Sequence, residues 1–300
     1  MFGPALGPRI REKALRGLAE HAGKSSGNCA NCLGRAGLPA SKRREVREVK
    51  IAVAVKIVPD SQDVAVGGNG EMDVSKARPV VSEYDLPAIE AAARVARKSP
   101  ESKVVAVTAG PASIDDSKVK KNVLARGADE LEMRAGDSLS ELDAFATAEV
   151  LAGVIEGLGD IDLVVCGDGS ADEYAQQVDV QLAERLGMPI ATSVVGLSVQ
   201  GGIATATRAL EDCVETVELG LPAVVSVTPD FATPRIPGMK DILAAGKRPM
   251  SVSGADSAPQ PTLETVELAA PEKTERNPTI VSASEDGAID RLAEAVKAAL

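Results

Sequence analysis

Buried-strand patterns and helical patterns alternate along the chain from about residue 50. Residues 51–58, 104–107 and 163–166 are short runs of β-branched and small apolar side chains, typical of strands covered on both faces. The segments between them carry apolar residues at a spacing of three and four, as helices do. The predicted helices are 86–96, 117–125 and 142–158. This alternation predicts an α/β fold with a largely parallel, doubly wound sheet.

After Pro189 the pattern changes into a β-rich second half. Short apolar runs separated by tight turns predict four consecutive strands. These strands are 190–199, 203–210, 215–219 and 224–228. The Ser-, Gly- and Pro-rich residues 229–260 are expected to run over the surface without regular structure. An extended C-terminal arm follows, with a strand predicted at 279–283 and a helix at 287–300.

One stretch, residues 163–186, combines a buried strand, a polar loop and a helix. The loop 167–170 is made of turn formers, and helical spacing starts at about Ala175. A helix N-terminus that follows such a loop offers free N–H groups to a phosphate. The ends of three predicted strands, at 54–58, 108–110 and 166–170, should meet at one edge of the sheet. A nucleotide site is expected there, and an ordinary β–α turn with nothing bound is the alternative.

Composition excludes several functional classes. The formal net charge is −11, which disfavours nucleic acid as a partner, and the chain has a single histidine, His21. Outside the first 48 residues a histidine-based triad is therefore excluded, and neither a P-loop nor a G-x-G-x-x-G motif follows the first strand. No apolar run is long enough to span a bilayer, and no secretory signal opens the chain, so a cytoplasmic location is expected.

The N-terminal residues 1–48 differ from the rest because they are basic and rich in Gly and Ala. Cys29 and Cys32 form a lone C-x-x-C, which lacks the further ligands that zinc requires. This segment is predicted to be a disordered or non-native extension. The α/β nucleotide-binding domain is expected at 49–245, and the C-terminal arm, with a helix that packs on a partner, at 246–300.

Four ordered motifs give the chain a family resemblance. They are V-A-V-K-I-V-P-D at 53–60, S-E-Y-D-L-P-A-I-E-A-A at 82–92, C-G-D-G-S-A-D-E-Y-A-Q-Q-V at 166–178 and R-A-L-E-D-C-V-E-T-V-E-L-G-L-P-A-V-V at 208–225. Together they resemble the β subunit of electron transfer flavoprotein. Y-A-Q-Q-V, S-E-Y-D-L and P-R-I-P-G-M-K at 234–240 are most similar to the FixA type. The resemblance covers residues 49–300.

The resemblance implies an electron carrier subunit with an adenine-nucleotide-binding type of fold, not an enzyme by itself. Its partner would be a larger α subunit, of the FixB type, that carries an FAD to whose site the β subunit lends one wall. The β subunit's own nucleotide would be AMP, or a second FAD in electron-bifurcating members. Electrons would pass between flavin dehydrogenases or reductases and quinone-reductase partners. The pathway implied for this branch is anaerobic carnitine (crotonobetainyl-CoA) reduction.

The same resemblance assigns residues to the cofactor and to the docking of partners. The implied cofactor-binding residues are Ala54, Ser82, Glu83, Tyr84, Asp85, Ala109, Gly167, Asp168, Gly169, Ser170, Asp172, Ala175, Gln176, Gln177 and Val178. Main-chain groups of Ala54 and Ala109 would face adenine, and residues 175–178 would present helix N-terminal amides to phosphate. Asp172 and Gln177 are the side chains expected to make polar contacts. The implied docking residues are Pro234, Arg235 and Met239.

Two departures from the family pattern concern the phosphate. Val178 and Asp179 stand where many members have Thr-Gly or Val-Gly-Pro, and Asp168 stands where Lys or Arg is commoner. Asp168, Asp172 and Glu173 are expected to be solvated loop carboxylates, with a bound cation or contacts to a ribose as the alternatives, and no metal site is predicted. A nucleotide sensor and an adenylate-using enzyme on the same scaffold are the alternative functions. The enzyme would need a phosphate-gripping cation, which the loop lacks.

Overall fold

The computed structural model describes residues 48–299 except Asn69, Pro100, Asp256, Glu267, Ala269 and residues 271–277. The predictions for the N-terminal extension, including Cys29 and Cys32, therefore lie outside the described residues. The described residues form two compact units, which are treated separately below. The larger unit is made of residues 48–64 and 74–265, and the smaller one of residues 65–73 and 266–299.

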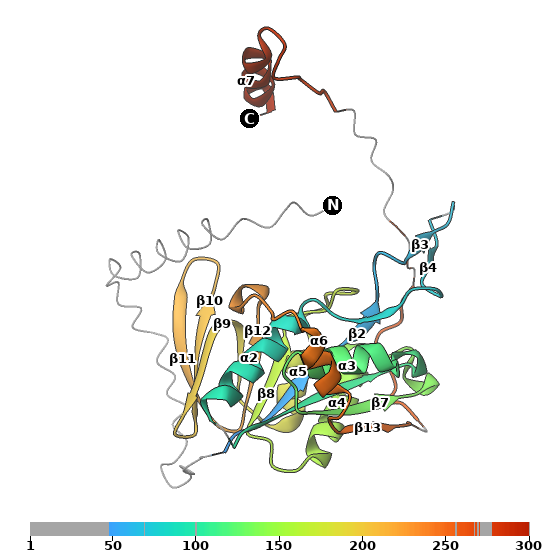
Figure 1. Cartoon of the computed structure of the whole chain (residues 1–300), viewed down its shortest axis with the longest axis vertical. Helices are drawn as coiled ribbons and strands as arrows, with labels where there is room; N and C mark the ends of the chain where they lie inside the picture. The colour runs from blue at the N-terminus through green and yellow to red at the C-terminus, as the bar shows by residue number, and fades with distance from the viewer. Residues whose placement is uncertain are drawn as a thin grey trace. The chain divides into compact units, whose positions relative to one another are not determined.

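A nine-stranded sheet runs through the larger unit (Figure 1). In spatial order its strands are β11 (Val214–Gly220), β10 (Ile203–Ala209), β9 (Ile190–Gln200), β12 (Ala223–Val227), β8 (Leu163–Gly167), β1 (Lys50–Ala54), β6 (Lys103–Gly110), β7 (Glu130–Ala135) and β13 (Met250–Ser253). The strands from β9 to β13 in this order are mutually parallel, and β10 and β11 extend the sheet in antiparallel fashion. The predicted parallel sheet with a β-rich second half is confirmed.

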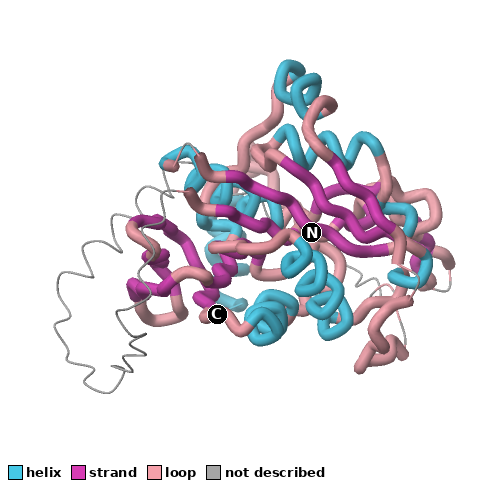
Figure 2. The backbone as a smooth tube through the Cα atoms, turned by 90° about the horizontal axis from the view of Figure 1, so that it is seen from below, coloured by secondary structure: helices cyan, strands magenta, loops and turns pink. Residues whose placement is uncertain are grey.

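Helices pack against both faces of this sheet (Figure 2). They are α2 (Asp85–Lys98), α3 (Ser117–Ala125), α4 (Ala144–Gly157), α5 (Val178–Leu186) and α6 (Met239–Ala245), with short 3₁₀ turns η2 (Ala112–Ile114), η3 (Asp137–Leu139) and η4 (Pro229–Phe231). The side chains of β1 alternate between two cores, because successive residues of a strand point to opposite faces. Ile51 and Val53 join the core under α2 and α3, whereas Ala52 and Ala54 join the core under α4 and α5.

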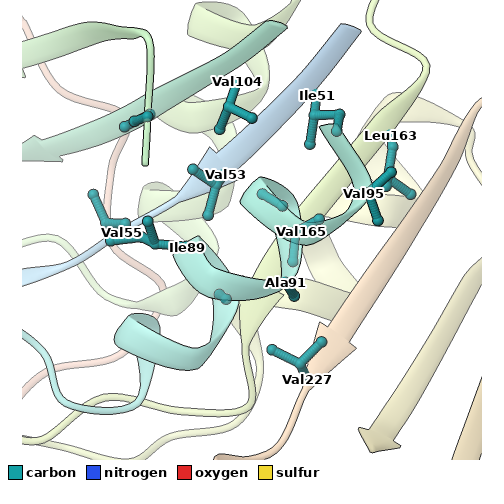
Figure 3. Packing of buried hydrophobic residues seen from close by; sticks show 14 of the residues in the cluster. Ile51, Val53, Val55, Ile89, Ala91, Val95, Val104, Leu163, Val165 and Val227 are labelled. Carbon is teal, nitrogen blue, oxygen red and sulfur yellow. The ribbon is translucent and has the colours of Figure 1, made fainter. Parts of the chain in front are cut away.

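The core under α2 shows why this chain needs few aromatic residues. Ile89 and Val95 of α2 lie over Ile51, Val53 and Val165 of the central strands, and all five are at most 5% exposed (Figure 3). Branched aliphatic side chains and alanines fill the space between helix and sheet. The doubly wound arrangement therefore follows from strands that are apolar on both faces.

The first strand is shorter than its sequence pattern predicts. The expected strand 51–58 is divided into β1, which ends at Ala54, and β2 (Ile57–Pro59), which pairs with β5 (Pro79–Val81) in a separate two-stranded sheet. The division occurs where the Lys56 N–H leaves the sheet and donates to Asp85 Oδ2 at 2.6 Å. A side chain 29 residues away thus interrupts a run whose local pattern is continuous.

The expectation of an irregular surface run at 229–260 is wrong for two elements. Strand β13 pairs in parallel with β7, with Met250 opposite Leu131, and so forms one edge of the main sheet. Helix α6 packs against α3 with Ala245 fully buried. Arg248 then donates to the carbonyl oxygens of Leu124 and Ala128 at the end of α3. These elements are short and bounded by Gly and Pro, so their sequence pattern resembles that of a loop.

The smaller unit contains a short hairpin and the C-terminal helix. Strands β3 (Ala65–Val66) and β4 (Met72–Asp73) are antiparallel, and Ala270 donates its N–H to the carbonyl of Gly70 between them. Helix α7 (Ala288–Ala299) is confirmed, and its apolar stripe of Ile289, Leu292 and Val296 is 50–83% exposed. The strand predicted at 279–283 is wrong, because the chain there turns, with the Glu285 N–H donating to the Ser282 carbonyl. None of the helices described in either unit has the length and apolarity to cross a membrane.

Replacing Leu163 with Ala is expected to lower the free energy of unfolding by about 2–5 kcal/mol, because a fully buried side chain of the central strand β8 would leave a cavity. Urea denaturation of the two proteins measures this difference. Leu263→Ala is the matched control, since Leu263 is 68% exposed and should change stability by less than about 0.5 kcal/mol. Equal losses in both variants would contradict this view of the core.

Candidate functional site

One cavity lies beyond the carboxyl ends of three neighbouring strands. Strands β8, β1 and β6 are adjacent in the sheet, and residues at or just after their ends line the cavity. These residues are Ala54, Val55, Lys56, Ala109 and Cys166–Ser170. The prediction that the three strand ends meet is confirmed. In open α/β sheets such an edge is where ligands bind.

Most, but not all, of the residues assigned to the cofactor line this cavity. Those that do are Ala54, Asp85, Ala109, Gly167, Asp168, Gly169, Ser170, Ala175, Gln176, Gln177 and Val178. Ser82, Glu83, Tyr84 and Asp172 do not line it. Contact of any of these residues with a cofactor stays a prediction, but the structure shows which of them share a wall.

Ser82 and Tyr84 brace the loop that forms the cavity's rim. The buried Ser82 hydroxyl accepts a hydrogen bond from the Ala171 N–H at 3.2 Å. The Tyr84 ring lies against the Tyr174 ring with centroids 4.8 Å apart, and the Tyr174 hydroxyl donates to Asp168 Oδ2 at 3.2 Å. These two residues therefore support the loop without lining the cavity. Glu83 is exposed.

The loop keeps an unusual backbone before α5. Tyr174 and Gln176 have φ angles of 49° and 54°, in the left-handed region that a helix cannot contain. The helix therefore begins at Val178, and the prediction that it starts at about Ala175 is wrong by three residues. The amides at 175–177 belong to the loop, and Val178 supplies the first helical amide.

Two glycines allow the loop to pass close to its neighbours. A Cβ atom at Gly169 would come within 2.2 Å of the Tyr174 ring. A Cβ atom at Gly167 would come within 2.6 Å of both Asp85 Oδ1 and the Tyr84 carbonyl oxygen. Since real Cβ contacts are never this short, any larger residue would displace the loop.

Asp85 is a buried carboxyl at the base of the cavity. It is 5% exposed and accepts hydrogen bonds from the backbone N–H groups of Lys56, at 2.6 Å, and Gly167. Burial raises the pKa of Asp85 to about 7, and the two hydrogen bonds oppose this rise. This carboxyl joins the ends of β1 and β8 to the start of α2.

Lys56 is the lining residue that sequence reasoning missed. Its ammonium Nζ lies 2.8 Å from Asp172 Oδ2 and 3.2 Å from Glu173 Oε2. Burial alone would lower the pKa of Lys56, but the two carboxylates raise it overall. Asp172 and Glu173 are exposed loop carboxylates, as predicted, and both also pair with this lysine. Its place near the end of a strand predicted to lead into the site could have identified it.

The N-terminus of α4 was also missed, although Leu142, Asp143, Ala144 and Thr147 line the cavity. Asp143 caps this helix by accepting from the Ala146 N–H at 2.8 Å, and it also accepts from the Thr262 hydroxyl and N–H. Burial raises the pKa of Asp143, but these hydrogen bonds outweigh it and lower the pKa to about 2. An aspartate directly before an apolar helix is a recognisable cap signal.

The three residues assigned to docking lie outside the cavity lining, in residues 234–239, which we call the docking segment. Met239, the last of them, is the first residue of α6. Arg235 faces the body of the unit, because its Nε donates to Glu90 Oε2 at 2.8 Å. Glu90 is a buried hub whose other oxygen accepts from Arg94 at 3.0 Å and Arg97 at 3.1 Å. Met239 is 74% exposed and Ile236 is 91% exposed. Among the residues the structure describes, no cluster of three His, Cys, Asp or Glu could hold a metal ion.

Comparison with protein families identifies the family of this chain. A model described as "Electron transfer flavoprotein domain" matches residues 72–271 of the 300. The match covers α2, β6, α4, β8, the loop before α5, and the docking segment. It therefore includes most of the walls of the cavity.

Asp85→Asn is expected to remove a pH dependence of stability. Because the pKa of Asp85 is raised in the folded chain, the folded state holds this proton more tightly than the unfolded state. Asp85 therefore favours folding most at low pH, and this contribution is lost as the pH rises toward 7. Between about pH 5 and pH 8 the free energy of unfolding of the wild type should fall by about 2–3 kcal/mol relative to Asp85→Asn.

Urea denaturation of both proteins at several pH values measures the difference. Other groups titrate equally in the two proteins, so the difference between the curves isolates Asp85. If the free energies of unfolding of the two proteins change in parallel with pH, the pKa of Asp85 is not raised in the folded state.

Proposed function

The chain belongs to the electron transfer flavoprotein family, and from this premise we propose that it is the β subunit of a heterodimeric electron carrier. Membership implies association with a flavin, a heterodimeric partner and a role in electron transfer. The assignment to the β subunit rests on the four motifs quoted above. Two of them form the end of β1 and the loop of residues 167–178, which line the cavity, and a third forms the start of α2.

We further propose that the subunit is of the FixA type and pairs with a FixB-type α subunit. The two motifs most typical of that branch contact each other, because Tyr84 of S-E-Y-D-L packs on Tyr174 of Y-A-Q-Q-V. A pair of motifs that is linked physically supports a shared function better than two separate matches. Anaerobic carnitine (crotonobetainyl-CoA) reduction is the pathway that this branch suggests.

In this proposal the shared FAD, when bound, supplies the redox chemistry, and the chain supplies position and surroundings. AMP and a second FAD, the two ligands that the resemblance offers for the subunit's own cavity, both contain adenosine. The strand ends at Ala54 and Ala109 fit an adenosine, because they present main-chain groups beside a mostly apolar wall. A second FAD in this cavity would make the carrier electron-bifurcating.

The docking segment is proposed to contact flavin dehydrogenase partners. Its apolar side chains, Ile236 and Met239, are highly exposed, and the flexible thioether of Met239 suits partners of different shape. The segment does not move freely, because Arg235 is held by Glu90 and its carbonyl accepts from Arg126 at 2.8 Å. Because Arg235 already holds the backbone of the segment, the segment loses little conformational entropy when a partner binds its exposed apolar side chains.

The purified heterodimer is expected to release FAD on denaturation, with at least one FAD per heterodimer. The full chain is produced together with its α subunit, the complex is purified and denatured, and FAD and AMP are quantified. One FAD supports a single-flavin carrier, and two FAD support a bifurcating one. A complex that contains no flavin would contradict the electron-carrier function and favour a nucleotide sensor.

Arg235→Ala is expected to loosen the docking segment. The variant loses the ion pair with Glu90, so the amides of residues 236–243 should exchange with deuterium about five- to tenfold faster, as local opening becomes easier by about 1 kcal/mol. The KM for a flavin dehydrogenase partner should rise with little change in kcat.

Arg97→Ala is the matched control. Arg97 pairs with the same Glu90 carboxylate at 3.1 Å but lies on α2, away from the docking segment in the chain. Hydrogen exchange at 236–243 and the KM should stay at wild-type values in this variant. If both variants behave alike, the ion pair serves only the stability of α2.

A further inference from the structure

Three helices begin at the wall of the cavity, and each brings its own carboxylate. Asp85 is the first residue of α2, Asp143 caps α4, and Asp179 lies in the first turn of α5. A helix N-terminus attracts anions because its N–H groups are unpaired and the dipole is positive there. A cavity built for phosphate would leave such ends open to the ligand. In this cavity aspartates already lie at all three.

Asp179 lies at the helix to which the phosphate would be assigned. The N-cap residue of α5, Gln177, makes no capping hydrogen bond with its side chain. The Asp179 carboxylate accepts a hydrogen bond from the Val180 N–H at 2.9 Å instead. Asp179 is 7% exposed and lines the cavity. A ligand anion at the start of α5 would therefore meet a buried carboxylate.

The other charges of the lining do not offset Asp179. Its ionisable side chains with Asp, Glu or Lys head groups are Lys56, Asp85, Asp143, Asp168, Glu173 and Asp179. The single ammonium among them, that of Lys56, already pairs with Glu173 and with the nearby Asp172. A phosphate dianion would have no uncompensated cation among these residues, and repulsion between like charges is strong in a partly buried site.

The cavity wall instead offers one buried acceptor that needs a donor. Asp168 Oδ1 is buried and has no hydrogen-bond partner among the described residues, although Oδ2 accepts from the Tyr174 hydroxyl. A buried acceptor without a donor is costly, so a ligand that supplies one gains affinity. The ribose hydroxyls and the amino group of adenosine are donors, whereas a phosphate dianion only accepts.

We propose that Asp179 takes the place of a ligand phosphate, so that the cavity selects uncharged adenosine over nucleotides that carry a phosphate at the start of α5. This inference rests on the proposed adenosine site and decides its ligand class. AMP, and equally the diphosphate of a second FAD, would have to place a phosphate against the Asp179 carboxylate. Free nucleoside brings no phosphate to Asp179 and can donate to the unpartnered Asp168 Oδ1.

Calorimetric titration of the full-length chain with adenosine and with AMP tests the proposal. The wild type should bind adenosine at least about tenfold more tightly than AMP. Asp179→Asn keeps the shape of the side chain and removes its charge, so AMP affinity should rise about tenfold or more. Adenosine affinity should change less than about threefold. The ratio of the two affinities is the readout, and a general loss of folding cannot produce this change in it.

Glu184→Gln is the matched control for Asp179→Asn. Glu184 lies on the same helix and is exposed, and it is absent from the cavity lining. Its substitution changes the net charge equally, so a ratio that shifts in this variant as well would overturn a local role of Asp179. The wild-type comparison does not depend on any variant: AMP binding as tight as adenosine binding overturns the proposal on its own.

Failure of this inference differs from failure of the proposed function. A heterodimer that holds FAD but also retains one AMP would keep the carrier function and refute the role of Asp179. A chain that binds neither adenosine nor AMP would refute both the adenosine site and this inference. The electron-carrier function would then still be decided by the flavin content of the heterodimer.

Discussion

The shape of the site depends on the hydrogen bonds that the buried Asp85 carboxyl accepts. By accepting the N–H groups of Lys56 and Gly167, it fixes the end of β1, the end of β8 and the start of α2 in one place. The diversion of Lys56 ends β1, which opens the edge of the sheet where the cavity lies. It also brings Gly167 so near that no side chain fits there. Strand length, cavity and glycine requirement thus have one cause.

The loop before α5 is held by contacts that come from distant parts of the chain. Tyr174 packs on Tyr84, and Lys56 reaches Asp172, which is 116 residues further along the chain. Tyr174 and Gln176 adopt left-handed backbone conformations, which are strained and must be held in place by such contacts. The rim is therefore prearranged by the fold of the larger unit.

Sequence reasoning predicted what local periodicity controls. The buried strands of the parallel sheet, α2, α4 and the meeting of three strand ends follow from patterns contained within each segment. It failed where contacts between residues far apart in the sequence determine the local structure. The division at Lys56 depends on Asp85, the start of α5 depends on Tyr174, and β13 depends on pairing with β7. The partners of Lys56 could not be read from its own surroundings, so the site's cation was missed.

Two aspartates of the cavity lining also serve the helices that begin there. Helix ends that face an open cavity carry unpaired N–H groups, which cost free energy when they are shielded from water. At α4 and α5 the chain itself answers this need, through the hydrogen bonds of Asp143 and Asp179. The hydrogen bonds to Asp143 outweigh its burial and lower its pKa to about 2, whereas burial raises the pKa values of Asp85 and Asp168. One amide at the start of each of these two helices is therefore satisfied by a carboxylate of the chain itself.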